Sequence, residues 1–351
     1  MLRRSGVAWK RRQRPDLVQF ADDGFVLGVT EPTWDNSGSR IPISGLVRNE
    51  TINLITSYDG QVISGLHLPY GRIEVRHKNI TIRDCIINIG WAPNGTNAAL
   101  GQRLHIQNNA AIVCNVNYDC SNLYVEHVTC DPINAGANGT ADDYDVSAFY
   151  FLSGATFYRC AARHVTDSYM PDEKANTPVA PTQVLGCYGE NRFLSVTPLA
   201  TDGTHCDGIQ YAGGAGHIAR GNAFHNPTGG VIDPASGFKV VGQNVVLTPY
   251  HSVISDVIID SNWFYGAYTQ VSNWVPTTYG YGGGVCPRIT VTNNIHQGQC
   301  VWPILFTPTS ATTATISGNK VGPAGLIWNN GTLAPGAAVN ATIAANNTNN
   351  P

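Results

Sequence analysis

Two carboxylates and an imidazole lie close together in the middle of the chain, at Asp202, His205 and Asp207. Such a group could supply a general acid, a general base and an orienting residue for cleavage of a glycosidic bond. If this stretch is a strand, side-chain alternation places His205 and Asp207 on one face and Cys206 on the other. The competing interpretation is structural, with Asp207 capping a turn and His205 bonding to a neighbouring segment.

A second candidate site is the glycine-rich segment from residue 266 to residue 284, which carries several aromatic residues. Sugars stack on aromatic rings through their apolar faces, but the same residue types are favoured at protein interfaces. Both interpretations stay open. The aromatic residues are Tyr268, Trp274, Tyr279 and Tyr281.

The composition indicates which elements must position these side chains. The chain has 351 residues, of which 42% are hydrophobic and only 13% charged, with 37 glycines and two methionines. Charged residues and Met are few, whereas Gly, Asn, Thr, Val and Ile, which have lower helix propensity, are abundant. We therefore expect strands and turns, and the apolar content is enough for a large core. No apolar run is long enough for a membrane-spanning helix.

A short motif recurs along the chain: a strand-like pattern that breaks at a small or amide residue. The intervals between successive copies range from 25 residues (Asn294 to Asn319) to 43 residues (Cys85 to Val128). Asn tolerates the left-handed conformation and bonds to nearby backbone groups, so we expect a stack of asparagines at equivalent turns. The aligned column contains Cys85, Val128, Cys160, Cys187, Asn222, Asn262, Asn294 and Asn319.

Strand-like repeats of this length without helices predict an all-β solenoid, a right-handed parallel β-helix. A β-sandwich or a propeller would need regular hairpins, and Asn-Gly or Asp-Gly turns between alternating strands are scarce. We expect three regions: a basic N-terminal arm and lead-in over residues 1–34, the β-helix over 35–328, and a C-terminal tail over 329–351.

Parts of the sequence resemble a known superfamily. The stretches Asp59–Leu66, Gly71–Val75 and Asn79–Cys85 resemble the opening coils of the pectate-lyase-like right-handed β-helix superfamily, and Thr204–Gln210 is similar to a later coil. The likeness is greatest to versions in actinobacterial proteins and in minor tail proteins of their phages. It covers roughly residues 35–322 and implies the fold more specifically than the activity.

Members of this superfamily include polysaccharide lyases, glycoside hydrolases, and tailspikes that only bind. The Asp207-Gly208-Ile209 step resembles part of a polygalacturonase motif, but the next coil has no vicinal Asp pair, and the Gly-His-Gly and Arg-Ile-Lys of those hydrolases are missing. We therefore expect a phage tail spike that binds a host surface polysaccharide during adsorption. Cleavage of that glycan by a lyase or hydrolase mechanism is the alternative, and a cell-surface adhesin is a third.

The N-terminus bears on partners and on location. Six basic residues precede Pro15, and no apolar stretch of signal-peptide length lies among them. We interpret this arm as a docking peptide for other virion tail proteins, because no base-reading architecture accompanies it to suggest nucleic-acid binding. The resemblance implies a homotrimer.

The nine cysteines have no CxxC pairs, and several lie in apolar strand patterns. They are expected to be reduced, buried thiols in a protein assembled in the host cytoplasm, with no metal and no cofactor.

Overall fold

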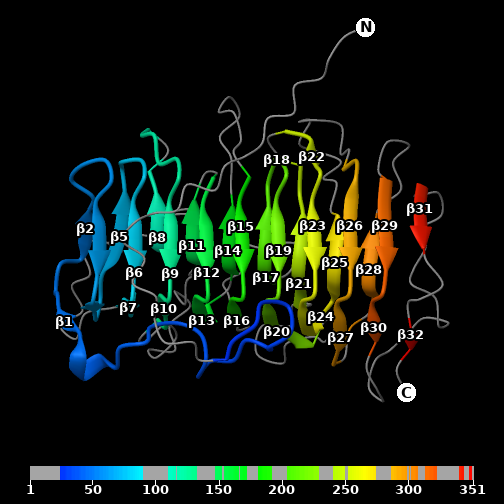
Figure 1. The fold of residues 1–351 in the computed structure, drawn as a ribbon, viewed down its shortest axis with the longest axis horizontal. Helices are drawn as coiled ribbons and strands as arrows, with labels where there is room; N and C mark the ends of the chain where they lie inside the picture. Colours follow the sequence, from blue (N-terminus) through cyan, green and yellow to red (C-terminus); the bar gives the residue numbers. More distant parts are fainter. Residues whose placement is uncertain are drawn as a thin grey trace, which may run out of the picture.

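The computed structural model shows a right-handed parallel β-helix, as the repeat predicts (Figure 1). Each full coil contributes one strand to each of three parallel sheets, in the order A, B, C along the chain. The structure describes residues 24–89, 110–115, 117–132, 147–151, 154–165, 167–171, 181–191, 204–228, 240–249, 252–273, 286–298, 300, 302–306, 313–321, 340–343 and 348–349.

Sheet A contains β1 (Val47–Arg48), β4 (Leu66–Leu68), β7 (Ile86–Ile87), β10 (Thr129–Cys130), β13 (Ala161–Val165), β16 (Tyr188–Asn191), β20 (Ala223–Thr228), β24 (Trp263–Ala267), β27 (Ile295–Gln297), β30 (Lys320–Val321) and β32 (Thr348–Asn349). Sheet B contains β2 (Asn53–Ile55), β5 (Arg72–Val75), β8 (Ala110–Cys114), β11 (Ser147–Phe151), β14 (Asp167–Pro171), β17 (Thr204–Tyr211), β21 (Val240–Leu247), β25 (Thr269–Asn273) and β28 (Trp302–Phe306).

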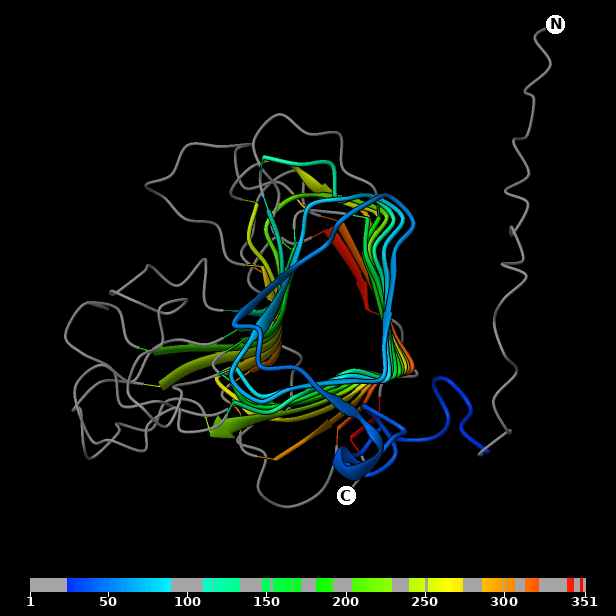
Figure 2. The same cartoon turned by 90° about the vertical axis from the view of Figure 1, so that its left-hand side faces the viewer.

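Sheet C contains β3 (Val62–Ser64), β6 (Thr81–Arg83), β9 (Tyr124–Glu126), β12 (Thr156–Tyr158), β15 (Gln183–Leu185), β19 (Ile218–Arg220), β23 (Ile258–Asp260), β26 (Ile289–Thr292), β29 (Thr313–Ser317) and β31 (Asn340–Ile343). A small additional sheet pairs β18 (Gly214–Ala215) with β22 (Ile254–Ser255), and a short 3-10 turn, η1, covers Ile43–Gly45. The strands of the described part of the chain pair in parallel, as in β10 with β13, β11 with β8 and β12 with β15. Figure 2 shows how the three sheets enclose one interior.

The passages from sheet C to sheet A are tight turns of constant form. One residue adopts a left-handed conformation, and the next faces the interior and is fully buried. The left-handed residues are Asp84, His127, Arg159, Gly186, Gly221, Ser261, Asn293 and Gly318, with φ from 49° to 65°. The buried residues that follow them form the column identified by the sequence repeat, from Cys85 to Asn319.

Asn222, Asn262, Asn294 and Asn319 form a hydrogen-bonded ladder inside this column. The side-chain oxygen of Asn262 accepts from the backbone N–H and the side-chain amide of Asn222, both at 2.9 Å. Asn294 accepts in the same way from Asn262, and Asn319 from Asn294. Each of the four amides also donates to a backbone carbonyl, for example Asn262 to Ala219 at 3.0 Å. The ladder thus satisfies the buried polar groups of the turns without water.

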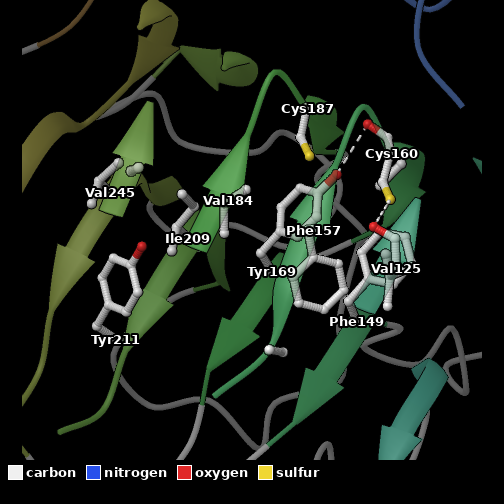
Figure 3. Close-up of a cluster of buried hydrophobic side chains, with 14 of the residues drawn as sticks. Val125, Phe149, Phe157, Cys160, Tyr169, Val184, Cys187, Ile209, Tyr211 and Val245 are labelled. Atoms are coloured by element: carbon white, nitrogen blue, oxygen red, sulfur yellow. Dashed lines mark hydrogen bonds between the residues drawn. The ribbon is translucent and has the colours of Figure 1, made fainter. Parts of the chain in front are cut away.

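Towards the N-terminus the column contains three cysteines and a valine in place of asparagines. Aromatic rings pack beside it in the interior of these coils. Figure 3 shows Phe149, Phe157 and Tyr169 packed beside Cys160 and Cys187. The Tyr169 ring stacks on Phe149 at a centroid distance of 5.0 Å, and its hydroxyl donates to the carbonyl oxygen of Cys160. All nine cysteines are buried and none is in a disulfide.

Variation in coil length arises outside the turns from C to A. One residue lies between the end of β13 at Val165 and the start of β14, whereas 22 residues lie between the end of β7 at Ile87 and the start of β8 at Ala110. At the C-terminal end, β31 pairs with β29 and β32 pairs with β30. The solenoid therefore extends past residue 328, into the segment expected to be a tail. The unpaired N–H and C=O groups at the edge of the preceding coil provide the bonding partners for these two strands.

Residues 24–41 run along the outside of the C-to-A turns, and we call this segment the strap. It is the blue segment outside one corner of the coil in Figure 2. Arg40 forms two hydrogen bonds with the Asp84 carboxylate, at 2.6 and 2.8 Å. The backbone N–H of Gly38 donates to the Arg159 carbonyl, and Glu31 accepts from the Tyr265 hydroxyl at 2.5 Å. The strap thus reaches from the turn before β7 to β24.

Glycines in two of these turns make room for the strap. A Cβ atom on Gly186 would lie 2.9 Å from the Phe25 ring, and one on Gly221 would lie 2.7 Å from the backbone nitrogen of Gly28. The Phe25 ring also lies 4.2 Å from the Arg159 guanidinium, in a cation–π contact. Residues 24–34, which the sequence analysis placed in the arm, therefore include a part that packs closely on the solenoid.

A charged network on the outer face of sheet B joins the first coils. The buried Glu74 carboxylate accepts hydrogen bonds from Arg76 and Asn115, both at 2.6 Å, and from Asn53 at 2.7 Å. Burial alone would raise the pKa of Glu74, but these three hydrogen bonds outweigh it and hold the pKa at about 2.

This network predicts an acid-sensitive stability. A carboxyl whose pKa is lower in the folded state stabilises the fold above its unfolded pKa, here 4.5, and loses that contribution as the pH falls through about 2. We expect the urea midpoint of the protein to fall between these pH values. Glu74→Gln should show a weaker pH dependence and a lower midpoint at neutral pH. An identical pH profile in the variant would contradict this role.

Candidate functional site

The structure gives Asp207 the environment of a structural residue. Its side chain is 3% exposed and accepts a hydrogen bond from the Gln243 backbone N–H at 3.1 Å. The Asp207 N–H donates in turn to the Asp167 carboxylate at 2.9 Å. The two carboxylates thus link the successive strands β14, β17 and β21. Asp202 and the side chain of His205 lie outside the described residues, so the expected grouping of these two with Asp207 stays a prediction.

The aromatic segment is described only at its start. Tyr268 is partly exposed between β24 and β25, and its backbone N–H donates to the Gly242 carbonyl at 2.7 Å. Trp274, Tyr279 and Tyr281 lie outside the described residues.

A different group of polar and aromatic side chains gathers on the outer face of sheet A. His225 in β20 stacks on Tyr265 in β24, with ring centroids 4.2 Å apart and planes inclined by 7°. On its other side it contacts Tyr188 in β16, at a centroid distance of 5.4 Å. Each tyrosine hydroxyl donates to a carboxylate, Tyr188 to Glu190 at 3.1 Å and Tyr265 to Glu31 of the strap. We call these five residues the sheet A face.

The strap and the neighbouring coils extend this face. Trp34 packs edge-on against Tyr188, with a centroid distance of 6.3 Å, and the Arg163 guanidinium lies 3.9 Å from the centre of its ring. Asp131 accepts from both Arg163 and His164, at 2.7 and 2.9 Å. Parallel strands in register carry Arg163, Glu190, His225 and Tyr265 outward from successive coils, about 4.8 Å apart. The result is a continuous polar row along the solenoid axis.

The chemistry of the sheet A face is that of hydrogen bonding. Because His225 and Tyr265 cover one another's ring faces, they present mainly ring edges to solvent. Tyr188 is buried, and the partly exposed groups are two carboxylates, the Tyr265 phenol and an imidazole, which are donors and acceptors suited to sugar hydroxyls. Burial lowers the pKa of His225, although Glu31 and Glu190 oppose this effect. The ring is therefore a neutral donor and acceptor at neutral pH.

Sequence reasoning did not single out this face as a site. Glu190, His225 and Tyr265 are spaced by 35 and 40 residues, and only the strand register shows that they are neighbours. The repeat alignment contained the necessary signal, because each of these three residues lies three positions after the column residue of its coil, Cys187, Asn222 or Asn262. Glu31 and Trp34 could not have been found in this way, since the strap lies outside the repeat.

Two absences apply to the described part of the chain. Among those residues, no group of three or more His, Cys, Asp and Glu side chains is arranged to hold a metal ion. No helix there has the length and apolar character needed to cross a membrane.

Comparison of the chain with protein-family models, with curated proteins and with solved structures finds no match. The fold and the sheet A face are thus established by the structure alone.

Proposed function

We propose that the protein binds a polysaccharide of a bacterial cell surface through the sheet A face, as a spike of a phage tail. The observation that carries the binding proposal is the row of Glu190, His225 and Tyr265, three polar side chains aligned along the axis on a rigid sheet. A polysaccharide offers hydroxyl groups at regular intervals, so a rod with donors and acceptors on successive coils suits an extended glycan. The virion assignment rests on the sequence resemblance and on the basic residues before Pro15.

Conservative changes on this face test the proposal. Glu190→Gln and Tyr265→Phe should each weaken binding to a printed array of bacterial surface polysaccharides by about ten-fold or more, the effect of losing one hydrogen bond to a charged or buried group. Arg288→Ala is the matched control, because Arg288 forms an exposed ion pair with Asp256 outside the sheet A face. Unchanged binding by both face variants would refute the site.

Two further measurements address assembly and the alternative function. We propose a homotrimer attached to other tail proteins through the part of residues 1–34 that precedes the strap, and native mass measurement should give three chains per particle. The position of His225 between Glu31 and Glu190 favours acid–base chemistry as the alternative, with the protein acting as a lyase or hydrolase. Shortening of the bound glycan during the assay would favour that alternative, and an intact glycan would favour binding alone.

A further inference from the structure

Two cysteines lie beside one another near the surface of an early coil. Cys114 is the last residue of β8, and Cys120 lies in the turn that leads to β9. The Cys120 sulfur is 3.1 Å from the Val75 carbonyl oxygen, and the backbone N–H of Asn115 donates to that same oxygen at 2.9 Å. Val75 is also the register partner of Cys114. The shared acceptor therefore places the Cys120 sulfur next to Cys114.

We propose that Cys114 and Cys120 are a site of oxidative modification, where a small-molecule disulfide converts the two thiols into an intrachain disulfide. The Cys120 thiolate attacks one sulfur of the reagent and releases its first thiol. The Cys114 thiolate then attacks the Cys120 sulfur of the mixed disulfide and releases the second thiol. Each cysteine gives up one proton to a released thiol, and the two electrons reduce the reagent. This chemistry is independent of glycan binding.

The surroundings of the pair suit this reaction. A hydrogen bond from the Cys114 thiol lowers the pKa of Cys120, against the opposing effect of burial, and so favours the attacking thiolate. Both side chains have slight exposure, 2% for Cys114 and 6% for Cys120, and Tyr118 in the intervening turn is 46% exposed. Cys120 is therefore the thiol of the pair that a reagent reaches first.

A second pair of thiols provides the contrast. Cys160 and Cys187 are neighbours in the buried column, but both have zero exposure and pack beside Phe157 and Tyr169 (Figure 3). Each is the buried residue of a C-to-A turn, and Phe25 of the strap packs against both turns, at Arg159 and Gly186. The two pairs therefore differ in access while sharing the same chemistry.

The test uses the folded, full-length protein and oxidised glutathione. After exposure, alkylation in denaturant and digestion, the segment containing Cys114 and Cys120 should carry a disulfide, whereas Cys160 and Cys187 should be alkylated. Cys120→Ser should abolish the bridge, and Cys187→Ser, the matched control, should leave it unchanged.

Full alkylation of Cys114 and Cys120 after prolonged exposure would overturn the proposal. So would a stable glutathione adduct on Cys120 without bridge formation, or a bridge that forms only in denaturant.

Discussion

Replacing Asn262 by Leu should lower the free energy of unfolding by about 3–5 kcal/mol, because the ladder loses a member that bonds in both directions. The variant leaves the buried Asn222 N–H without its acceptor and removes the donor to the Ala219 carbonyl. Each buried group without a partner costs about 1–3 kcal/mol. Urea unfolding followed by circular dichroism measures the change.

The control for this variant lies in the same column. Cys160→Val introduces the residue that Val128 already provides at the equivalent turn, and the Cys160 sulfur makes two long hydrogen bonds, of 3.5 Å to the Val125 carbonyl and 3.6 Å to the Tyr158 carbonyl. We expect it to cost less than about 1.5 kcal/mol, as for other swaps of similar volume. Equal effects of the two variants would show that packing, rather than the amide ladder, stabilises the turns.

Gly221→Ala should detach the N-terminal part of the strap. The new methyl group would lie 2.7 Å from the Gly28 nitrogen and 2.8 Å from a Leu27 methyl carbon. A backbone atom cannot rotate away, so residues 25–30 must move. Overpacking of this kind costs about 1–3 kcal/mol, which corresponds to faster amide exchange in the strap by about ten-fold to a hundred-fold. Hydrogen exchange at the Val29 and Thr30 amides measures it.

Gly65→Ala separates this collision from backbone strain. Gly65 has φ +69°, close to the +65° of Gly221, yet nothing lies within 4 Å of its Cβ position. Both variants should lose about 1 kcal/mol of folding free energy, because alanine is strained in the left-handed conformation. Only Gly221→Ala should also expose the strap. Rapid exchange in both would mean that general destabilisation, rather than contact with Gly28, releases the segment.

The sequence repeat predicted the solenoid and its column of turn residues because both follow from local rules. A residue such as Asn262 is recognisable from the strand pattern before it and from the conformational tolerance of Asn. Coil boundaries were harder to place, because β31 and β32 come from a segment rich in Ala, Asn and Thr, and the open edge of the preceding coil determines their pairing.

The sheet A face and the strap depend on contacts between distant residues. Nothing near Glu31 in the sequence indicates a bond to Tyr265, which lies 234 positions away. Asp207 illustrates the opposite difficulty. Its type and neighbours suggested catalysis. In the structure its side chain is buried and accepts from the Gln243 backbone N–H, while its own N–H donates to the Asp167 carboxylate, and only the strand register reveals those partners.

The strap also determines where mechanical tension would enter the rod. A pull applied through residue 24 reaches the turns at Arg159, Gly186 and Gly221 before it reaches the first coil, because Phe25, Leu27 and Gly28 contact those turns. The exposed first strands, β1 to β3, would carry load only after the strap had peeled as far as Arg40. A particle tethered by this end would therefore strain the middle of its solenoid and spare the coil with the open edge.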